Sequence, residues 1–227
     1  MKTAIIADIH SNLEALQAVL KEIKKLKIKE IYCAGDIVGY GANPNECIEL
    51  VKKYKIKSVI GNHDLCALNF EGFDWFNSNA QHAIEWTNEN LSEKNKDFLL
   101  KLPLTLKEEN MLMVHGSVEN PLYDYVYYYT SDSYFKNIFD SNKKIKILIM
   151  GHTHLPFIKK FKEGTVINPG SIGQPRDGNN KASFCVLNSK ISRAKIIRIS
   201  YDVEKTAHKI LHFGLPEFFA ERLYLGT

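Results

Sequence analysis

The chain has 227 residues, 44% of them hydrophobic and 25% charged, which is enough for one large α/β domain with its own core. Its formal charge of +4 is spread over single or paired lysines. Such lysines are typical of solvated helix faces, so the charge disfavours a nucleic-acid partner. No apolar run reaches membrane-spanning length, which disfavours a membrane protein.

Cysteine usage and the first residues predict a cytoplasmic protein. The four cysteines are scattered without a CxxC pair, as is typical of reduced, buried thiols. Asp8 interrupts the first apolar run, so we expect no signal peptide.

Strands and helices are predicted to alternate over the first 64 residues. Three apolar runs predict strands: 2–7, 31–34 and 57–60. Two helices are predicted between them, over 12–27 and 44–54. The first is capped by Ser11 or Asn12, and Asn43 with Pro44 opens the second. This alternation favours a parallel sheet.

Residues 65–140 follow another pattern, rich in aromatic side chains. They predict three helices and one strand: 80–90, 92–100 and 131–140, with the strand at 111–114. A tyrosine-rich loop, 121–130, precedes the last of these helices. We expect one domain over 1–227, in which 65–140 is a helical and loop insertion that shapes a pocket.

The last third of the chain predicts short strands. They are expected at 146–150, 157–161, 165–167, 183–187 and 195–199, followed by a helix at 203–212 and a short tail from 216. After residue 154, separation by Gly, Asn and Ser is typical of antiparallel strands. Two mixed sheets packed face to face, with helices on both outer faces, would bury all these strands. We therefore predict an α+β fold, a four-layer αββα sandwich.

Side chains that can bind metals follow five of the predicted strands. They are Asp8 and His10, Asp36, Asn62 and His63, His115, and His152 with His154. Sites in open α/β sheets lie at the carboxyl ends of strands, so we expect these residues to meet there.

The donor set indicates a transition-metal site. Imidazole, carboxylate and amide donors without thiolate suit Mn, Fe, Zn or Ni rather than Ca or a structural zinc. In Asp8-x-His10 and His152-x-His154, alternate residues point the same way if the backbone is extended. Sharing Asp36 would hold two ions about 3.5–4 Å apart, the range for in-line displacement at phosphorus.

Five motifs in order resemble the calcineurin-like metallophosphoesterase family. They are DIH (8–10), GD (35–36), GNHD (61–64), HG (115–116) and GHTH (151–154). The chain is most similar to small single-domain bacterial and archaeal members, in which DIHSN and NPGSIGQPR (168–176) are familiar phrases. The resemblance implies the αββα fold and hydrolysis of phosphomonoesters or phosphodiesters, with a hydroxide between two metal ions, Mn being the first choice.

The resemblance also implies a role for each motif residue. The first metal would be held by Asp8, His10, Asp36 and His154. The second would be held by Asp36, Asn62, His115 and His152. His63 would donate a proton to the leaving oxygen or steady the phosphate.

Several residues near the motifs have two interpretations. Asp64 either orients His63 or caps the following helix, and Asn12 is interpreted as a cap rather than a phosphate contact. Arg176 is interpreted as a phosphate clamp, the alternative being a surface arginine in a turn. The tyrosines of 123–129 either stack on the base of a nucleotide or pack loops and a partner subunit in a homo-oligomer.

Departures from related families narrow the function. Ile37 to Gly41 replace the VDRG phrase of protein Ser/Thr phosphatases, which disfavours that activity. His63 is retained, which favours an active enzyme over a metal-bearing interaction scaffold. A hydrolase of dinucleoside polyphosphates is the narrower alternative.

Overall fold

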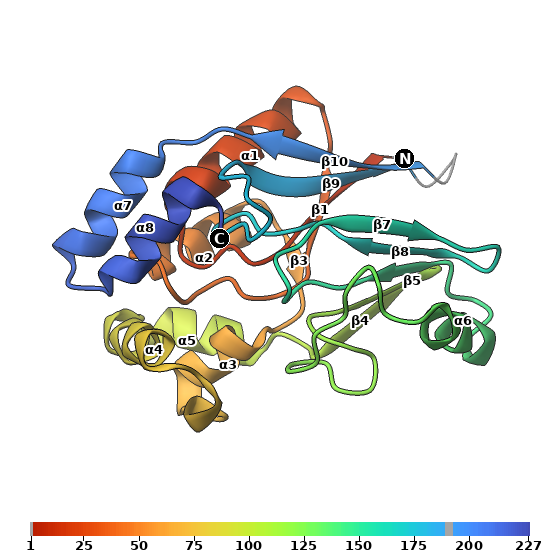
Figure 1. The fold of residues 1–227 in the computed structure, drawn as a ribbon, viewed down its shortest axis with the longest axis horizontal. Helices are drawn as coiled ribbons and strands as arrows, with labels where there is room; N and C mark the ends of the chain where they lie inside the picture. Colours follow the sequence, from red (N-terminus) through yellow and green to blue (C-terminus); the bar gives the residue numbers. More distant parts are fainter. Residues whose placement is uncertain (1, 189–192) are drawn as a thin grey trace.

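The computed structural model describes residues 2–188 and 193–227. Two five-stranded sheets lie face to face, and helices flank their outer faces (Figure 1). The predicted αββα sandwich of two mixed sheets is confirmed.

The first sheet has the strand order β10-β9-β1-β2-β3. Its strands are β1 (Lys2–Ile6), β2 (Glu30–Cys33), β3 (Lys57–Ser58), β9 (Ala182–Asn188) and β10 (Arg193–Ile199). β1, β2 and β3 are parallel, whereas β9 pairs antiparallel with both β1 and β10. Helices α1 (Leu13–Lys25) and α2 (Pro44–Lys53) connect the parallel strands. Asn12 caps α1, because its side chain accepts a hydrogen bond from the Ala15 N–H.

The second sheet has the order β4-β5-β6-β8-β7. Its strands are β4 (Thr105–Glu108), β5 (Met111–Val114), β6 (Ile147–Ile149), β7 (Phe157–Lys160) and β8 (Thr165–Asn168). The antiparallel pairing expected after residue 154 is confirmed for β7 with β8 and for β9 with β10, and β8 also pairs in parallel with β6. β4 and β5 lie within 65–140, so this segment also builds the second sheet.

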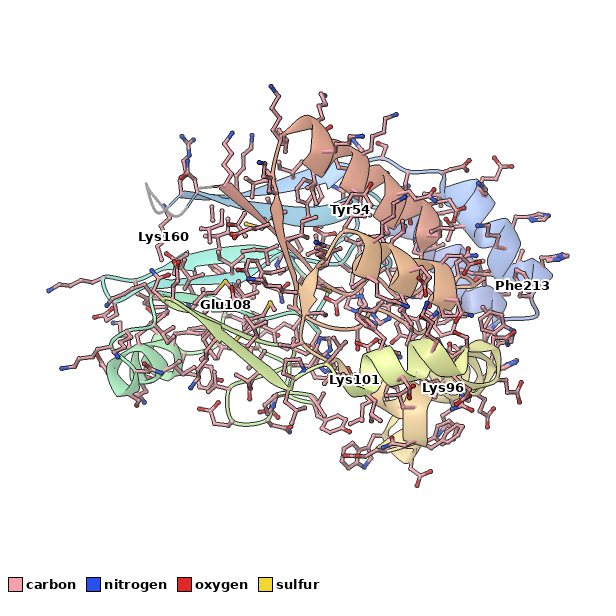
Figure 2. The ribbon with its side chains drawn as sticks, turned by 180° about the vertical axis from the view of Figure 1, so that it is seen from behind. Tyr54, Lys96, Lys101, Glu108, Lys160 and Phe213 are labelled. Atoms are coloured by element: carbon pink, nitrogen blue, oxygen red, sulfur yellow. The ribbon has the colours of Figure 1, made fainter. Side chains whose placement is uncertain are left out.

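The alternation of side chains along β1 separates two apolar layers. Ala4 and Ile6 face the helices of the first sheet, whereas Ile5 faces the second sheet together with Met113 and Ile149. Side chains fill the space between the layers, as Figure 2 shows from the side opposite to Figure 1. Helix α6 (Asp132–Ser141) covers the second sheet in a third apolar cluster. All four cysteines are free and buried.

The other helices are α3 (Asn62–Asn69), α4 (Ser78–Asn90), α5 (Glu93–Leu100), α7 (Val203–His212), α8 (Glu217–Leu225) and the 3₁₀ turn η1 (Phe73–Trp75). The tail expected after residue 216 is wrong, because α8 buries Phe219 and Leu223 in a cluster with α7. No helix in the described ranges is long and apolar enough to cross a membrane.

Candidate metal centre

The loops after β1, β2 and β6 carry their polar residues on left-handed backbone. The φ angles are 52° at Asp8, 47° at His10, 53° at Asp36, 67° at His152 and 60° at His154. The extended backbone expected in the two x-spaced pairs is therefore wrong, and tight turns aim these side chains instead. Left-handed backbone costs non-glycine residues about 1–2 kcal/mol each, and such strain concentrates at functional sites.

One group of side chains joins the end of β1 to the loop after β6. His10 Nε2 lies 3.0 Å from His154 Nε2, and Asp8 Oδ1 lies 3.6 Å from the same His154 nitrogen. All three residues are buried and could hold one ion.

A second group forms around His115. Its Nε2 lies 3.0 Å from Asn62 Oδ1, 3.0 Å from His152 Nδ1 and 3.3 Å from Asp36 Oδ2. The same Asp36 oxygen lies 3.6 Å from His10 Nε2 in the first group. The structure thus brings together every residue that the motifs nominate as a metal ligand, with Asp36 between the two groups.

Backbone contacts fix which ring nitrogens face the centre. The Nδ1 atoms of His10, His115 and His154 lie 3.1, 2.7 and 2.5 Å from the carbonyl oxygens of Val38, Ala34 and Gln174. A carbonyl only accepts, so each Nδ1 must donate, and Nε2 is the nitrogen that faces the centre. In the neutral rings of His10 and His154, this Nε2 presents a lone pair. The facing Nε2 atoms of His10 and His154 are then two acceptors at 3.0 Å, which a shared cation would satisfy.

Backbone contacts also orient the carboxylates of Asp8 and Asp36. Asp8 Oδ1 accepts from the His152 N–H at 3.1 Å, and Asp36 Oδ1 accepts from the His63 N–H at 3.0 Å. Their Oδ2 atoms are buried without a hydrogen-bond partner in the described part of the chain. Buried, unpaired carboxylate oxygens are costly, and a cation is the partner that their chemistry requires. The donor set therefore fits divalent metal ions.

Burial and mutual charge shift the titration of these groups. Burial raises the pKa of Asp8 to about 8 and lowers the pKa of His10 well below its ordinary value. Burial opposes charge on His115 and Asp36 as well, but each is held charged by the other. The pKa of His115 rises to about 9, and the pKa of Asp36 falls below its ordinary value. A cation in place of the His115 proton would preserve this attraction.

Gly61 and Asp64 connect helix α3 to the loop that carries Asp36. A Cβ at Gly61 would lie 2.0 Å from Asp36 Oδ1, so only glycine allows this approach. Asp64 accepts from the Ile37 and Val38 N–H groups at 2.8 and 2.9 Å, and from the Gly61 N–H at 3.0 Å. These bonds match the capping interpretation of Asp64, since both of its oxygens are bound to backbone.

His63 lies on the first turn of α3, against aromatic rings. Its ring centroid is 4.9 Å from that of His10, 4.4 Å from Tyr40 and 4.7 Å from Phe76. Burial lowers the pKa of His63 to about 4, and its Nδ1 is buried without a partner among the described residues. The ring therefore borders the centre, with its Nδ1 on the side that packs against Gly39.

Arg176 places a guanidinium beside the centre. Its Nη2 donates to Tyr40 Oη at 3.3 Å and to Gln174 Oε1 at 3.2 Å. No carboxylate of the described residues lies within ion-pair distance of it, and its Nε is buried without a partner there. Its positive charge acts to lower the pKa of Asp8. Such an arginine suits an anionic ligand.

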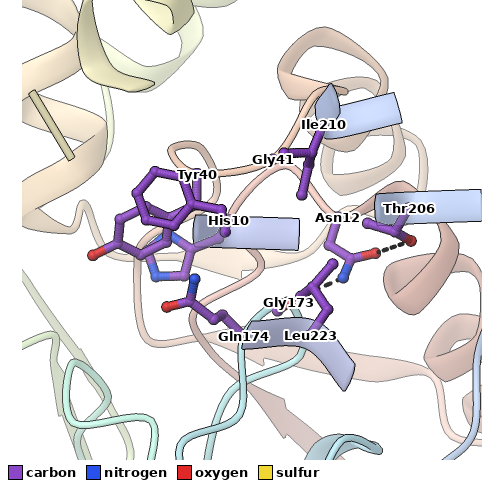
Figure 3. A pocket seen from close by; sticks show the side chains of 10 residues that line it. His10, Asn12, Tyr40, Gly41, Gly173, Gln174, Thr206, Ile210 and Leu223 are labelled. Carbon is purple, nitrogen blue, oxygen red and sulfur yellow. Dashed lines mark hydrogen bonds between the residues drawn. The ribbon is translucent and has the colours of Figure 1, made fainter. Parts of the chain in front are cut away.

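A cavity of about 10 Å³ borders His10 (Figure 3). Asn12 crosses it, donating to the Gly173 carbonyl at 2.9 Å and accepting from Thr206 Oγ1 at 3.3 Å. This volume holds about one water molecule. The cavity is therefore too small for a substrate, and its lining residues pack beside His10.

Sequence reasoning missed two ring contacts of the centre. Tyr40 stacks at 4.4 Å on His10, and Phe76 packs on His63. Tyr40 could have been suspected only from its position four residues after Asp36, and nothing in the sequence singles out Phe76. Outside the two groups lie His82 on α4 and His208 with His212 on α7, as expected.

Known proteins are similar to this chain over most of its length. A family model for the calcineurin-like phosphoesterase superfamily domain matches residues 1–191. An uncharacterized protein of Methanocaldococcus jannaschii is 42% identical over 98% of this chain and 97% of its own. The crystal structure of a metallophosphoesterase from Sphaerobacter thermophilus has a TM-score of 0.86 and 31% identity, over 100% of both chains.

A more local similarity involves an enzyme with a named substrate. The symmetrical bis(5'-nucleosyl)-tetraphosphatase of Actinobacillus pleuropneumoniae is 38% identical over 68 residues. The match covers 29% of this chain and 25% of that enzyme, so it concerns a part of each.

Proposed function

The chain belongs to the calcineurin-like phosphoesterase superfamily, and we propose that it hydrolyses phosphomonoesters or phosphodiesters with two bound divalent metal ions. The observation that carries the proposal is the position of Asp36 Oδ2, which faces His10 Nε2 at 3.6 Å and His115 Nε2 at 3.3 Å. One oxygen between two donor groups is the arrangement that a pair of cations requires.

The two donor groups define the proposed ligands. The first ion would be held by Asp8, His10, Asp36 and His154, and the second by Asp36, Asn62, His115 and His152. Mn is the first choice, with Fe, Zn and Ni as alternatives that the same donors suit. When bound, the pair would supply an activated water and neutralise phosphate charge.

The remaining residues would orient the substrate. Arg176, without a carboxylate partner in the described ranges, would clamp a phosphate oxygen. His63, whose ring lies 4.9 Å from that of His10, would donate a proton to the leaving oxygen or steady the phosphate. Asp64 would not contact the substrate. It holds the loop that carries Asp36 against helix α3, and so it would position Asp36 and His63.

A second candidate is hydrolysis of dinucleoside polyphosphates. Tyr125 favours it, because this half-exposed ring stacks 4.0 Å from His152 at the edge of the centre. The free, buried cysteines support a cytoplasmic location for either activity. A scaffold without turnover is disfavoured, because His63 and all proposed ligands are present and face one another.

The test combines metal content with turnover in one preparation. Protein stripped with chelator and reconstituted with Mn should bind two ions and hydrolyse p-nitrophenyl phosphate or bis-p-nitrophenyl phosphate. Asp36→Ala should lose both ions, because it removes the oxygen common to the two groups. Asp97→Ala, on the exposed face of α5, is the matched control and should retain both. Fully metallated protein that hydrolyses neither ester would contradict the proposal.

A further inference from the structure

Three tyrosines continue outward from the candidate centre as one stack, here called the tyrosine row: Tyr125, Tyr127 and Tyr129. Tyr125 stacks on His152 with ring centroids 4.0 Å apart. Tyr127 follows at 6.2 Å with an interplanar angle of 12°, and Tyr129 at 5.0 Å and 6°. The rings of Tyr127 and Tyr129 are thus almost parallel, although a turn closed by the Thr130 N–H and the Tyr127 carbonyl spans these residues.

The loop that carries the row is firmly held. Val126, between two of the tyrosines, is buried in the apolar cluster under α6. Thr130 exchanges hydrogen bonds with Tyr127, through its Oγ1 and its N–H, both at 3.0 Å. Lys159 Nζ donates to the carbonyls of Tyr128 and Thr130 at 2.9 and 3.1 Å. The backbone that carries the rings is thus held before any ligand arrives, which lowers the entropy cost of binding.

The row nevertheless presents much of its surface to solvent. Tyr125 is 52% exposed and Tyr129 is 79% exposed. Aligned, exposed rings on a rigid loop beside a catalytic centre indicate a binding surface. Flat rings stack on such a surface, and every nucleobase offers a flat face.

Charge decides which kind of nucleotide fits. Residues 117–135 include Glu119, Asp124 and Asp132 but no lysine or arginine. The lysine that reaches this loop, Lys159, is paired with Asp132 at 2.7 Å. A single-stranded nucleic acid needs a basic groove along its phosphates, and this loop offers none. A ligand whose phosphates all lie at the metal centre is better matched.

We propose that the tyrosine row binds the far nucleobase of a small dinucleotide whose phosphates reach the metal centre. This inference rests on the proposed phosphoesterase function and names its substrate class. A ring attached directly to the scissile phosphate can meet Tyr125, which touches His152. Tyr127 lies one ring-to-ring step beyond Tyr125, and Tyr129 lies two steps beyond it, so the end of the row can contact only a base separated from that phosphate by a linker.

The first experiment compares two substrates in the Mn-loaded enzyme, diadenosine tetraphosphate and bis-p-nitrophenyl phosphate. In the double variant Tyr127→Ala/Tyr129→Ala, kcat/KM for the dinucleotide should fall about tenfold or more relative to that for the aryl ester, mainly through KM. Tyr127→Phe/Tyr129→Phe should restore it, since stacking needs only the ring. Tyr128→Ala is the matched control, because its ring points to Phe157 instead. An unchanged ratio in the alanine variant overturns the inference while the aryl-ester activity upholds the proposed function.

The second experiment needs no turnover. Calorimetric titration of a non-hydrolysable methylene analogue of diadenosine tetraphosphate into the Mn-loaded protein should show affinity about tenfold weaker in the double alanine variant. This readout separates the two proposals, because it can succeed even if no ester is hydrolysed. A thymidine tetranucleotide serves as the single-stranded comparison. If the double alanine variant loses more affinity for it than for the dinucleotide, the assignment to a small ligand is overturned. If light scattering instead shows that the variant dissociates an oligomer while dinucleotide binding is unchanged, the row is a contact between copies and the inference fails.

Discussion

Asp36 illustrates how the centre is prepared at the scale of single residues. Its Oδ1 is occupied by the His63 N–H, so the rotation of the carboxylate is fixed and Oδ2 faces the donor groups. Asp8 repeats the arrangement, with its Oδ1 on the His152 N–H. In one case the first turn of α3 supplies the backbone amide that orients the carboxylate, and in the other the loop after β6 does. The positions of both carboxylates therefore depend on segments that carry other candidate ligands.

Replacing His63 separates chemistry from metal binding. In His63→Ala we expect two bound metal ions and a rate lowered about a hundredfold or more, as for a lost general acid. The metals should stay because Asp36 contacts the backbone N–H of residue 63, which alanine retains. Elemental analysis and initial rates on one preparation measure both effects.

The control for that variant is His82→Ala, an exposed histidine on α4, which should change neither quantity. An empty site in His63→Ala would show that the ring itself is a ligand and that its proposed role is wrong.

At this scale, motif order identified the residues that gather at the centre but not the rings around them. Each nominated ligand follows a strand, and strand ends are recognisable as the ends of apolar runs. Contacts such as that between His63 and Phe76 join α3 to the loop beyond η1, and no periodicity encodes them. The role of Asp64 also needed coordinates, because capping and orientation require the same residue type at the same place.

At the scale of elements, capping and apolar periodicity located most helices. The helix over 203–212 was predicted with its observed bounds, and α1 begins after Asn12 as expected. The errors lie where an element is short. β3 has only two residues, because beyond it the Ile60 N–H donates to the Pro103 carbonyl and not to β2. β4 was missed, since it is a partly exposed edge strand without a continuous apolar run. α8 is held by packing on α7, which a local pattern does not reveal.

A polar contact links the two sheets at the end away from the centre. Tyr32 on β2 donates its hydroxyl to Glu108 on β4, and Lys57 on β3 donates to both Glu108 oxygens at 2.8 Å (Glu108 is labelled in Figure 2). Glu108→Ala should lower the free energy of unfolding by about 1 kcal/mol, because Lys57 and Glu108 are partly exposed and solvent screens their attraction. Urea denaturation at pH 7 measures this.

The stabilisation by Glu108 depends on pH. Hydrogen bonds from Lys57 and Tyr32 hold the pKa of Glu108 below its ordinary 4.5. The stabilisation is therefore complete above pH 4.5 and is lost as the pH falls through the lower folded pKa. The difference between wild type and Glu108→Ala should shrink in acid. Glu93→Ala, which removes an exposed ion pair on α5, should have little effect at any pH, and an equal loss there would contradict the assignment.

At the scale of the whole molecule, the centre is assembled by the packing of the two sheets. Each donor group takes residues from both: Asp8 and His10 from the first sheet meet His154 from the second. Likewise, Asp36 and Asn62 meet His115 and His152 across the same interface. Neither sheet alone holds a complete group. Metal binding and the association of the sheets should therefore be thermodynamically linked.

This linkage predicts that metal stabilises the fold. Without cations, two carboxylates and several imidazoles lie buried with unpaired atoms facing one another, which disfavours the packed state. At a free Mn concentration of 100 times Kd, binding at one site contributes about 2.7 kcal/mol, which in a chain of this size raises Tm by about 5–10 °C. Thermal unfolding of chelator-treated protein, with and without added Mn, measures the shift. Asp36→Ala should unfold at the same temperature with or without Mn, since it lacks the oxygen that both groups share. If the wild-type Tm is the same with and without Mn although Mn binding is measured, the metals do not join the two sheets.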